Sequence, residues 1–308
     1  MINRPSVSDP ETETARRFAP AQSPRQVLLD ELPVTERRLG LTGISTAVLE
    51  AGEGPPLVLL HGPGGYAAHW MGVIPELSKA HRVIAPDLPG HGASDAGDAA
   101  LDSDRVLSWL SELIDQTCAA RPVLVGQLIG GAIAARFAID HGVRLAGLVL
   151  IDTFGLGAFQ PSPEFGSALN EFLEAPSEDT HDKLWRRCAH NLPGLRRRMG
   201  ELWQPFAAYN LERAQNPGQQ AAMGALMKEF AFAPIPAADL ARISLPTTLI
   251  WGRHDLATPL AVAEAASARY RWPLHVIENA NDDPPIEQPE ALLSALQIAL
   301  ETAGARPA

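Results

Sequence analysis

The 308-residue sequence predicts an α/β fold built on a mostly parallel, doubly wound sheet with an inserted helical segment. Three observations lead to this prediction. Short apolar runs alternate with stretches of helical periodicity, which is typical of strands buried on both faces of a parallel sheet. The alternation stops between residues 155 and 237 and then resumes. A composition of 46% hydrophobic and 20% charged residues is enough to bury a large core.

Charge and cysteine content narrow the class of protein. The formal charge of −11 argues against a nucleic-acid or anionic-membrane partner, because both favour a basic face. Cys118 and Cys188 have the spacing of neither a disulfide framework nor a zinc site, and we expect no metal or cofactor. No run has the length of a transmembrane helix, and the first residues lack the apolar core of a signal peptide. We therefore expect a cytoplasmic protein whose partner is a small molecule, of undetermined oligomeric state.

The elements are expected in a fixed order along the chain. Residues 1–33 have no sustained apolar period and are interpreted as a flexible arm. The core comprises residues 34–154 and 238–303, and it opens with an antiparallel hairpin at 34–39 and 44–49. Residues 155–237 hold most of the large side chains and are expected to form a helical cap, and 304–308 a tail. Further strands are predicted at 56–60, 83–86, 145–152, 247–251 and 274–277, with amphipathic helices after residue 102 and from about 287.

Residues 123–132 carry the most informative motif. An apolar strand passes through a glycine-flanked turn into an Ala-rich helix, which is the layout of a nucleophile elbow, G-x-S-x-G. The nucleophile position holds Leu128, and an alkyl side chain can neither attack a carbonyl nor carry an acyl group. An elbow residue normally has φ > 0, which strains a branched side chain by roughly 1–3 kcal/mol. Leu128 is therefore expected either to keep this strained turn or to relax into a regular helix start.

Five motifs, in this order along the chain, resemble the capped α/β-hydrolases, which include epoxide hydrolases, C–C bond hydrolases, dehalogenases and small-ester hydrolases. The resemblance spans roughly residues 34–303 and implies an α/β-hydrolase fold with a helical cap. The motifs are H-G at 61–62, D-L-P-G-H-G-A-S at 87–94, G-x-x-x-G-G at 126–131, W-G-R-H-D at 251–255 and P-P-I-E-Q-P-E at 284–290.

The resemblance also implies where a catalytic triad would lie. The acid falls at Asp255, whereas the histidine position holds Asp282 and the nucleophile position holds Leu128. Of the two oxyanion donors, the N–H of Ile129 is available, but the other falls at Pro63, which has no N–H. Gly64 would replace it only if the loop shifts. The triad is thus degenerate, and the serine mechanism lacks its nucleophile, its base and one oxyanion donor together.

Asp255 and Asp282 take the place of the usual histidine–acid pair. If they face each other, one takes up a proton at a raised pKa, and the pair offers a general acid and a general base. The alternative is that Asp282 merely caps the turn at 281–284, whose residues are all turn formers. Both interpretations stay open. A ligand is expected in an apolar cleft under the cap, in contact with Gly62, Pro63, Gly64, Gln127, Leu128, Ile129 and Trp203.

Three functions fit these observations. The first is an enzyme that acts on a small, largely apolar molecule without a serine nucleophile, through aspartate acid/base chemistry such as water activation, epoxide opening, enolisation, cyclisation or elimination. The second is a catalytically silent relative that binds a small ligand or a protein partner. The third is an inactivated or engineered variant of an esterase. The first is favoured, because the cap and the pocket loops persist around the replaced pair.

Overall fold

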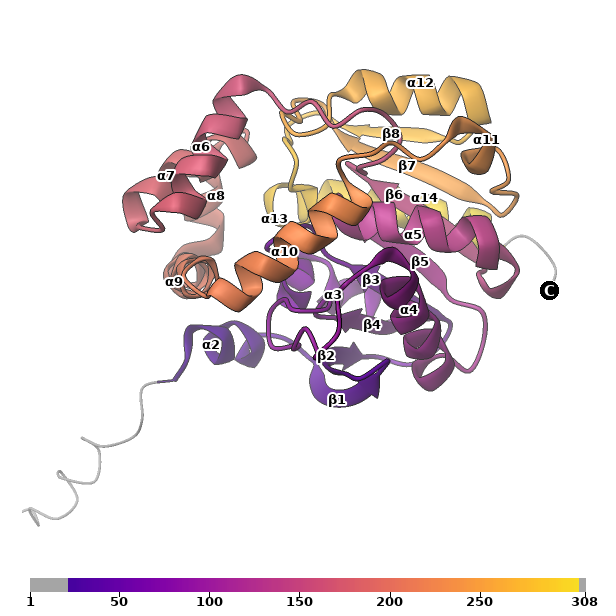
Figure 1. Cartoon of the computed structure of the whole chain (residues 1–308), viewed down its shortest axis with the longest axis horizontal. Helices are drawn as coiled ribbons and strands as arrows, with labels where there is room; N and C mark the ends of the chain where they lie inside the picture. Colours follow the sequence, from indigo (N-terminus) through magenta and orange to yellow (C-terminus); the bar gives the residue numbers. More distant parts are fainter. Residues whose placement is uncertain (1–21, 305–308) are drawn as a thin grey trace, which may run out of the picture.

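Residues 22–304, the part of the chain that the computed structural model describes, are built around an eight-stranded sheet (Figure 1). The strand order is β1-β2-β4-β3-β5-β6-β7-β8, and neighbours are parallel from β4 onward. β2 pairs antiparallel with β1 and β4, so the predicted opening hairpin and the mostly parallel α/β fold are confirmed. The strands are β1 Thr35–Leu41, β2 Ile44–Ala51, β3 Pro56–Leu60, β4 Arg82–Pro86, β5 Val123–Gln127, β6 Gly147–Ile151, β7 Thr247–Gly252 and β8 Leu274–Ile277.

Helices cover both faces of the sheet, and this explains the continuous apolar runs. Successive side chains of a strand point to opposite faces, so Val58 and Leu60 of β3 join one buried cluster while Leu57 and Leu59 join the other. Helices α4, α5 and α12 pack in the first cluster, and α3 and α14 in the second. Their bounds and those of the short connecting helices are η2 Ala67–Gly72, α3 Ile74–Leu77, α4 Ser103–Thr117, α5 Ile129–His141, η3 Gly142–Arg144, α12 Leu260–Tyr270, α13 Pro284–Glu287 and α14 Pro289–Gly304.

The segment between β6 and β7 is helical: α6 to α9 lie at the left of the view, α10 crosses the middle, and α11 lies near β7 (Figure 1). Four of its helices begin at a Ser or Asn whose side chain accepts a backbone N–H of the first turn, which satisfies a donor that the helix itself leaves free. These residues are Ser162, Ser177, Asn191 and Asn216. The helices are α6 Pro163–Glu174, α7 Glu178–Cys188, α8 Leu192–Met199, η4 Gly200–Leu202, α9 Trp203–Ala214, α10 Pro217–Phe230 and α11 Ala237–Leu240.

The expectation of a flexible arm is wrong for residues 24–30, which form helix α2 (Pro24–Asp30). Ser23 caps this helix, and Leu28 and Leu29 are buried where α2 contacts α9. One short apolar run gives no helical period in the sequence, and its partner lies far along the chain. Residues 1–21 and 305–308, which complete the predicted arm and tail, lie outside the described residues. Within residues 22–304, no helix is long and apolar enough to cross a membrane.

Candidate functional site

The turn between β5 and α5 keeps the geometry of an elbow. Leu128 has φ 47° and ψ −110°, so it retains the strained conformation and does not relax into the helix. Its N–H donates to the carbonyl of Ile151 at 2.9 Å, and its own carbonyl accepts from Ala132 at 3.0 Å and from Phe154 at 3.2 Å. Hydrogen bonds to β6, α5 and the following loop thus hold a residue whose backbone strain is roughly 1–3 kcal/mol.

Glycines around the elbow permit the close approach of β5, α5 and β3. A Cβ on Gly126 would collide with the backbone of Gly130, and a Cβ on Gly130 would collide with the backbone carbonyls of Leu60 and His61. The backbone of the nucleophile position is therefore intact, although its side chain carries no chemistry.

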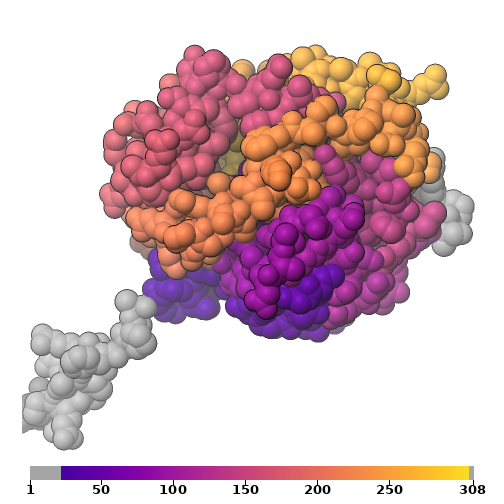
Figure 2. Space-filling model, in the orientation of Figure 1, coloured from indigo at the N-terminus to yellow at the C-terminus, as the bar shows by residue number. Residues whose placement is uncertain are grey.

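An apolar cavity of about 480 Å³ lies above the elbow. Residues at the carboxyl ends of strands β3, β5 and β6 line it from the sheet, and helices α6, α7, α9 and α10 line it from the other side. The space-filling view shows a hollow between the α6 and α10 segments (Figure 2). Five residues expected to contact a ligand are among those that line the cavity, namely Gly62, Pro63, Gly64, Gln127 and Leu128.

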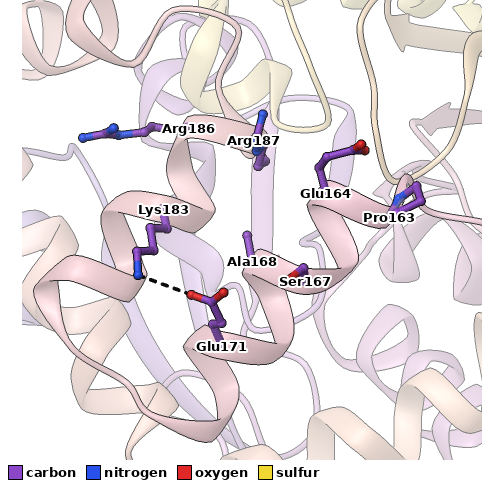
Figure 3. Close-up of a pocket in the computed structure, with 8 residues that line it drawn as sticks. All are labelled: Pro163, Glu164, Ser167, Ala168, Glu171, Lys183, Arg186 and Arg187. Atoms are coloured by element: carbon purple, nitrogen blue, oxygen red, sulfur yellow. Dashed lines mark hydrogen bonds and ion pairs between the residues drawn. The ribbon is translucent and has the colours of Figure 1, made fainter.

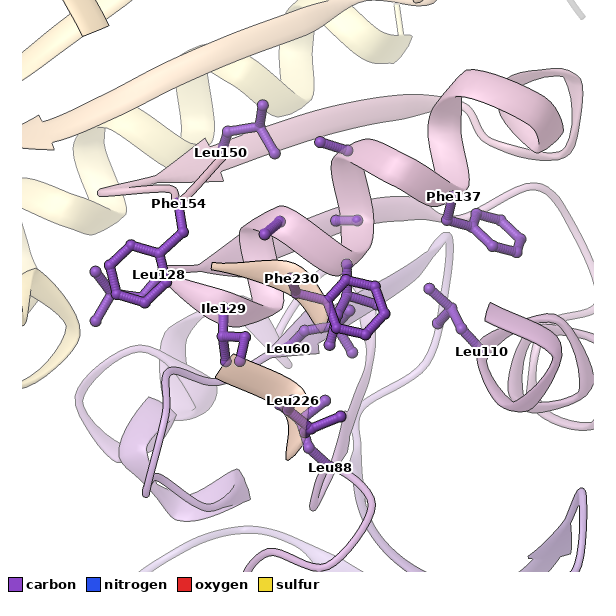
Figure 4. Packing of buried hydrophobic residues seen from close by; sticks show 14 of the residues in the cluster. Leu60, Leu88, Leu110, Leu128, Ile129, Phe137, Leu150, Phe154, Leu226 and Phe230 are labelled. Carbon is purple, nitrogen blue, oxygen red and sulfur yellow. The ribbon is translucent and has the colours of Figure 1, made fainter. Parts of the chain in front are cut away.

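The other two expected ligand contacts, Ile129 and Trp203, do not line the cavity. The side chain of Ile129 is fully buried in the cluster that contains Leu60 and Leu226 (Figure 4). Trp203 packs edge-on against Trp185, with ring centroids 5.9 Å apart, in the aromatic core of the helical segment. The expectation for Trp203 is corrected, because packing among neighbouring apolar residues takes its side chain away from the cavity. The expected contact of Ile129 is through its backbone N–H, which the packing of the side chain does not affect, and it stays a prediction.

Asp282 and Asp283 are among the residues that line the cavity. Gln127, beside the elbow, fixes their loop: its Nε2 donates to the carbonyl of Asp282 at 2.9 Å and to Oδ1 of Asp283 at 3.1 Å. The Oδ1 atom of Asp282 is buried and has no hydrogen-bond partner among the described residues. Asp282 thus lies on the wall of the cavity, which mere capping of the turn would not require.

Asp255 lies behind Asp282 and is not among the residues that line the cavity. Its Oδ1 accepts the N–H groups of Ala257 at 2.7 Å and Thr258 at 2.8 Å. Asp152, whose Oδ1 accepts the N–H of Gly252 at 2.8 Å, lies within hydrogen-bond reach of Asp255. Among the described residues, no N–H or O–H group donates a hydrogen bond to Oδ2 of Asp152 or of Asp255. A hydrogen bond between these two carboxyls therefore requires a proton on one of them.

Burial raises the pKa values of this group of carboxyls. For Asp282, burial and then the neighbouring Asp255 raise the pKa well above its ordinary value. For Asp152 the causes are the same, in the same order, and its pKa is also well raised. Burial raises the pKa of Asp255 to about 7, against the lowering effect of its backbone hydrogen bonds. The expected pair of a protonated and an ionised carboxyl is thus consistent with these shifts, with Asp152 as an additional member.

Two more acids enlarge the cluster. Burial raises the pKa of Asp283 to about 7, and the hydrogen bond from Gln127 works in the opposite direction. Burial raises the pKa of Glu287 to about 8, although Glu287 accepts the N–H groups of His190 at 2.6 Å and Asn281 at 2.8 Å. Among residues 22–304, no group of three or more His, Cys, Asp or Glu side chains is arranged to hold a metal ion.

In the loop after β3, the expected position of the second oxyanion donor is held by Pro63, which has no N–H. Gly64 has φ 62°, and its carbonyl and that of Gly65 accept hydrogen bonds from the Nη1 atom of the buried Arg213 in α9. The Nη2 atom of Arg213 donates to Oδ1 of Asn210 at 2.7 Å. Arg213 therefore fixes the loop from the helical segment, across a contact between residues that are far apart in sequence.

His61 and His91 have structural hydrogen bonds. Nδ1 of His61 faces the carbonyl of Gly62 at 2.8 Å, and Nε2 accepts the N–H of Leu88 at 3.0 Å. Nδ1 of His91 faces the carbonyl of Pro89 at 3.1 Å, so Nδ1 is the donor and Nε2 is the acceptor. Burial lowers the pKa of both rings to about 3, and they are neutral at physiological pH.

Sequence reasoning missed several polar residues that line the cavity, among them His69, Asn210 and Arg213. None of these three lies in a motif of the resemblance, and Asn210 and Arg213 belong to α9, whose position over the sheet no local pattern predicts. Asp283 was also missed as a site residue, although it is adjacent to Asp282. The Asn-Asp-Asp-Pro run at 281–284 was the only available signal, and it is equally typical of a turn.

A second hollow lies between α6 and α7, on the outside of the helical segment (Figure 3). Its volume, about 590 Å³, is larger than that of the cavity above the elbow, but it is an open groove with charged walls. Across this groove, Lys183 forms an ion pair with Glu171 at 3.4 Å, and it also pairs with Asp179 at 3.0 Å. The strand ends and the buried acids lie at the other cavity, which we take as the candidate site.

Comparison with known proteins agrees with this fold and site. Residues 57–295 match the model of the family described as "Alpha/beta hydrolase family". The chain is 33% identical over 216 residues to the pimeloyl-[acyl-carrier protein] methyl ester esterase of Nitrosomonas europaea, which covers 69% of this chain and 82% of that protein. It is 31% identical over 226 residues to the 2-hydroxy-6-oxo-6-phenylhexa-2,4-dienoate hydrolase of Comamonas testosteroni, covering 68% of this chain and 75% of that protein.

A solved structure extends the match over the whole fold. The meta-cleavage product hydrolase of Pseudomonas fluorescens IP01 is similar with a TM-score of 0.73 and 25% identity, over 87% of this chain and 98% of that one. The relatives named here are esterases and hydrolases, which supports an enzyme. From its sheet order, its elbow and these matches, the chain belongs to the α/β-hydrolase family.

Proposed function

We propose that this protein is an enzyme that transfers protons to and from a small, largely apolar carbonyl compound or epoxide, with Asp282 as the general acid and with no covalent intermediate at position 128. The observation that carries the proposal is the place of Asp282: it lies on the wall of an apolar cavity, and its Oδ1 has no partner in the described part of the chain.

The carboxyls behind Asp282 give it the protonation state that a general acid needs. Burial and then the neighbouring Asp255 raise its pKa well above the ordinary value, and this shift favours the protonated form. A protonated carboxyl can donate a hydrogen bond, and then its proton, to a carbonyl or epoxide oxygen as negative charge develops there. Asp255 and Asp152 are positioning residues in this proposal, since Asp255 does not line the cavity.

The nature of the cavity and of the relatives indicates the class of substrate. Apart from the polar residues around Asp282, aromatic and aliphatic side chains line most of the cavity, among them Phe154, Phe165, Phe172 and Leu184. Apolar walls bind apolar parts of a ligand and exclude water, which strengthens electrostatic contacts within the site. The named relatives act on a methyl ester and on an oxo-dienoate, and both of these are carbonyl compounds.

A catalytically silent, ligand-binding protein is the second candidate. It is favoured by Leu128 at the nucleophile position and by Pro63 in the oxyanion loop, because these residues remove two parts of the serine mechanism. In that case the cavity would still bind a small apolar molecule, but nothing would be converted.

A panel of three probe classes tests the proposal. Small apolar ketones are followed by NMR for exchange of α-protons in D2O, epoxides by mass spectrometry for ring opening, and p-nitrophenyl esters by absorbance. We expect turnover of ketones or epoxides, and a loss of about 10²-fold or more in Asp282→Asn, which keeps the size of the side chain but has no acidic proton. Asp255→Asn is expected to lower the rate less, because it acts through Asp282.

Leu128→Ala is the matched control, since it alters another cavity residue that takes no part in proton transfer. Its rate should stay within about tenfold of wild type. Undiminished turnover in Asp282→Asn would refute the proposal. Turnover of esters with a burst of nitrophenol would indicate a covalent nucleophile, and inertness towards every probe would favour the silent binding protein.

A further inference from the structure

His69 and Asp283 form a second histidine–carboxylate pair at the cavity. His69 belongs to η2, Asp283 directly precedes α13, and both line the cavity wall. Their Nε2 and Oδ2 atoms are 3.7 Å apart. This is slightly beyond a formed hydrogen bond, and such contacts commonly shorten when a ligand is bound. Neither residue occupies a triad position carried over by the resemblance, so this pair is separate from the histidine–acid pair expected at positions 282 and 255.

The surroundings hold both partners in place. Oδ1 of Asp283 accepts the hydrogen bond from Gln127, which leaves Oδ2 on the side of His69. The imidazole packs edge-on against Tyr66, with centroids 4.7 Å apart, and lies 5.6 Å from the ring of Phe206. Its Nδ1 is buried and receives no hydrogen bond from any described residue. The ring is thus fixed by aromatic packing, with a carboxylate on one side.

Burial and the nearby Arg213 keep the imidazole of His69 neutral, and only a neutral ring has a free nitrogen lone pair. Burial lowers the pKa of His69 well below its ordinary value, and the positive charge of Arg213 acts in the same direction. Burial raises the pKa of Asp283 to about 7, so its carboxylate form is present from neutral pH upward. A carboxylate beside an imidazole stabilises the imidazolium that forms when the ring takes a proton. The titratable groups that also face Asp283 are Asp282, Glu287 and Tyr66.

We propose that the His69–Asp283 pair is the general base of this site and that its substrate class is an enolisable, largely apolar ketone. The inference rests on the proposed role of Asp282 and deepens it. His69 removes a proton from the carbon next to the carbonyl, and the electrons of that C–H bond form a C=C bond. The electrons of the C=O π bond move to oxygen, which takes the proton of Asp282. The product is the enol, and the reverse transfers return the ketone with a solvent-derived proton.

The adjacent positions of Asp282 and Asp283 support the assignment of an acid and a base at one site. Asp282 and Asp283 are neighbours on one loop, and Gln127 binds both of them. An acid and a base therefore meet the same region of the cavity without a nucleophile between them. His91 is an internal comparison: it is buried, neutral and on the same cavity, but its Nδ1 bonds to a backbone carbonyl, and no carboxylate is paired with it.

The test is the rate of α-proton exchange of phenylacetone in D2O, measured by NMR with wild type, His69→Gln, Asp283→Asn and the matched control His91→Gln. We expect a loss of about 10²-fold in the first two variants and less than about threefold in the control. The double variant should lose little more than either single variant, because the two residues act as a unit. Exogenous imidazole should restore exchange in His69→Ala but not in His91→Ala.

The pH profile separates a catalytic role from a structural one. In wild type the rate should rise with pH as Asp283 ionises, with a midpoint near 7, and Asp283→Asn should remove this limb. Rates of His69→Gln and Asp283→Asn equal to wild type, with Asp282→Asn inactive, would overturn the base assignment and leave the proposed function standing. A wild-type protein that exchanges no proton of phenylacetone and converts no other probe would overturn the proposed function itself.

Discussion

The elbow and the loop after β8 differ in what their side chains offer. At the elbow the backbone has the strained turn, with Leu128 held at φ 47°, while the side chain is chemically inert. In the loop, Asp282 lies among buried acids with raised pKa values. The elbow therefore keeps a backbone geometry without a reactive side chain, whereas the loop concentrates ionisable groups.

The double substitution Leu128→Ser with Asp282→His tests whether the elbow lacks only its side chains, and it has the largest expected effect. Serine would lie at the strained turn, and histidine would lie beside Asp255. We expect hydrolysis of p-nitrophenyl butyrate to rise roughly 10–100-fold over wild type, limited by the missing N–H of Pro63.

Leu128→Ser alone is the control, and it should match wild type because no base activates the hydroxyl. A folded double variant without esterase activity would show that the retained elbow backbone is not sufficient. High activity, comparable to that of efficient esterases, would favour a recently inactivated esterase over a protein with its own chemistry.

The acidic loop predicts that stability falls as pH rises from about 4, where the unfolded carboxyls ionise, to about 8, and this effect is of intermediate size. The folded-state pKa values of Asp255 and Asp283 are raised to about 7 and that of Glu287 to about 8. The folded protein therefore holds protons that the unfolded chain releases. Each such proton lowers the free energy of unfolding by about 1.4 kcal/mol per pH unit until the folded-state pKa is reached.

Buried histidines act in the opposite direction only at lower pH. Burial lowers the pKa of His61 and His91 to about 3. Their contribution to the free energy of unfolding is therefore complete above about pH 6.5 and is lost as pH falls towards 3. Urea unfolding at pH 6.5 and 8.0 should show the decline, and Asp282→Asn should reduce it by up to about 1.4 kcal/mol per pH unit. The exposed Asp98→Asn should not change it. If Asp282→Asn and Asp98→Asn lose the same stability between pH 6.5 and 8.0, the pKa of Asp282 is not raised.

The variants Leu128→Gly and Leu128→Ala test for strain at the elbow. Glycine is usually less stabilising than alanine, and a strained position should reverse this order. The expected difference in the free energy of unfolding is the smallest of the three effects. Glycine adopts φ 47° without a Cβ penalty. In urea unfolding, the free energy of unfolding of Leu128→Gly should therefore equal that of Leu128→Ala or exceed it by up to about 1 kcal/mol. Ala221→Gly in α10 is the control and should lose about 0.5–1 kcal/mol, as in an ordinary helix. If glycine is less stable than alanine at both positions, Leu128 is not strained.

Local patterns were sufficient to predict most of the core. β3 and β8 have the predicted bounds, and the other strands differ by a few residues. The apolar runs predict them because each strand buries both faces, which leaves little alternative for such a sequence. Helix α2 was missed because its stability depends on packing against α9, and packing of this kind has no local signature.

By itself, the sequence determined the sheet and the elbow and predicted the replacement of the nucleophile and the histidine, because each depends on neighbouring residues and their fixed spacing. Only the tertiary structure decided which polar groups share one cavity. It placed Asp283 and His69 on the wall and Asp152 beside Asp255, and it directed Trp203 away from the cavity. The physical reason is that these side chains come from separate elements, and their burial, pKa values and pairing arise only when the sheet and the helical segment pack together.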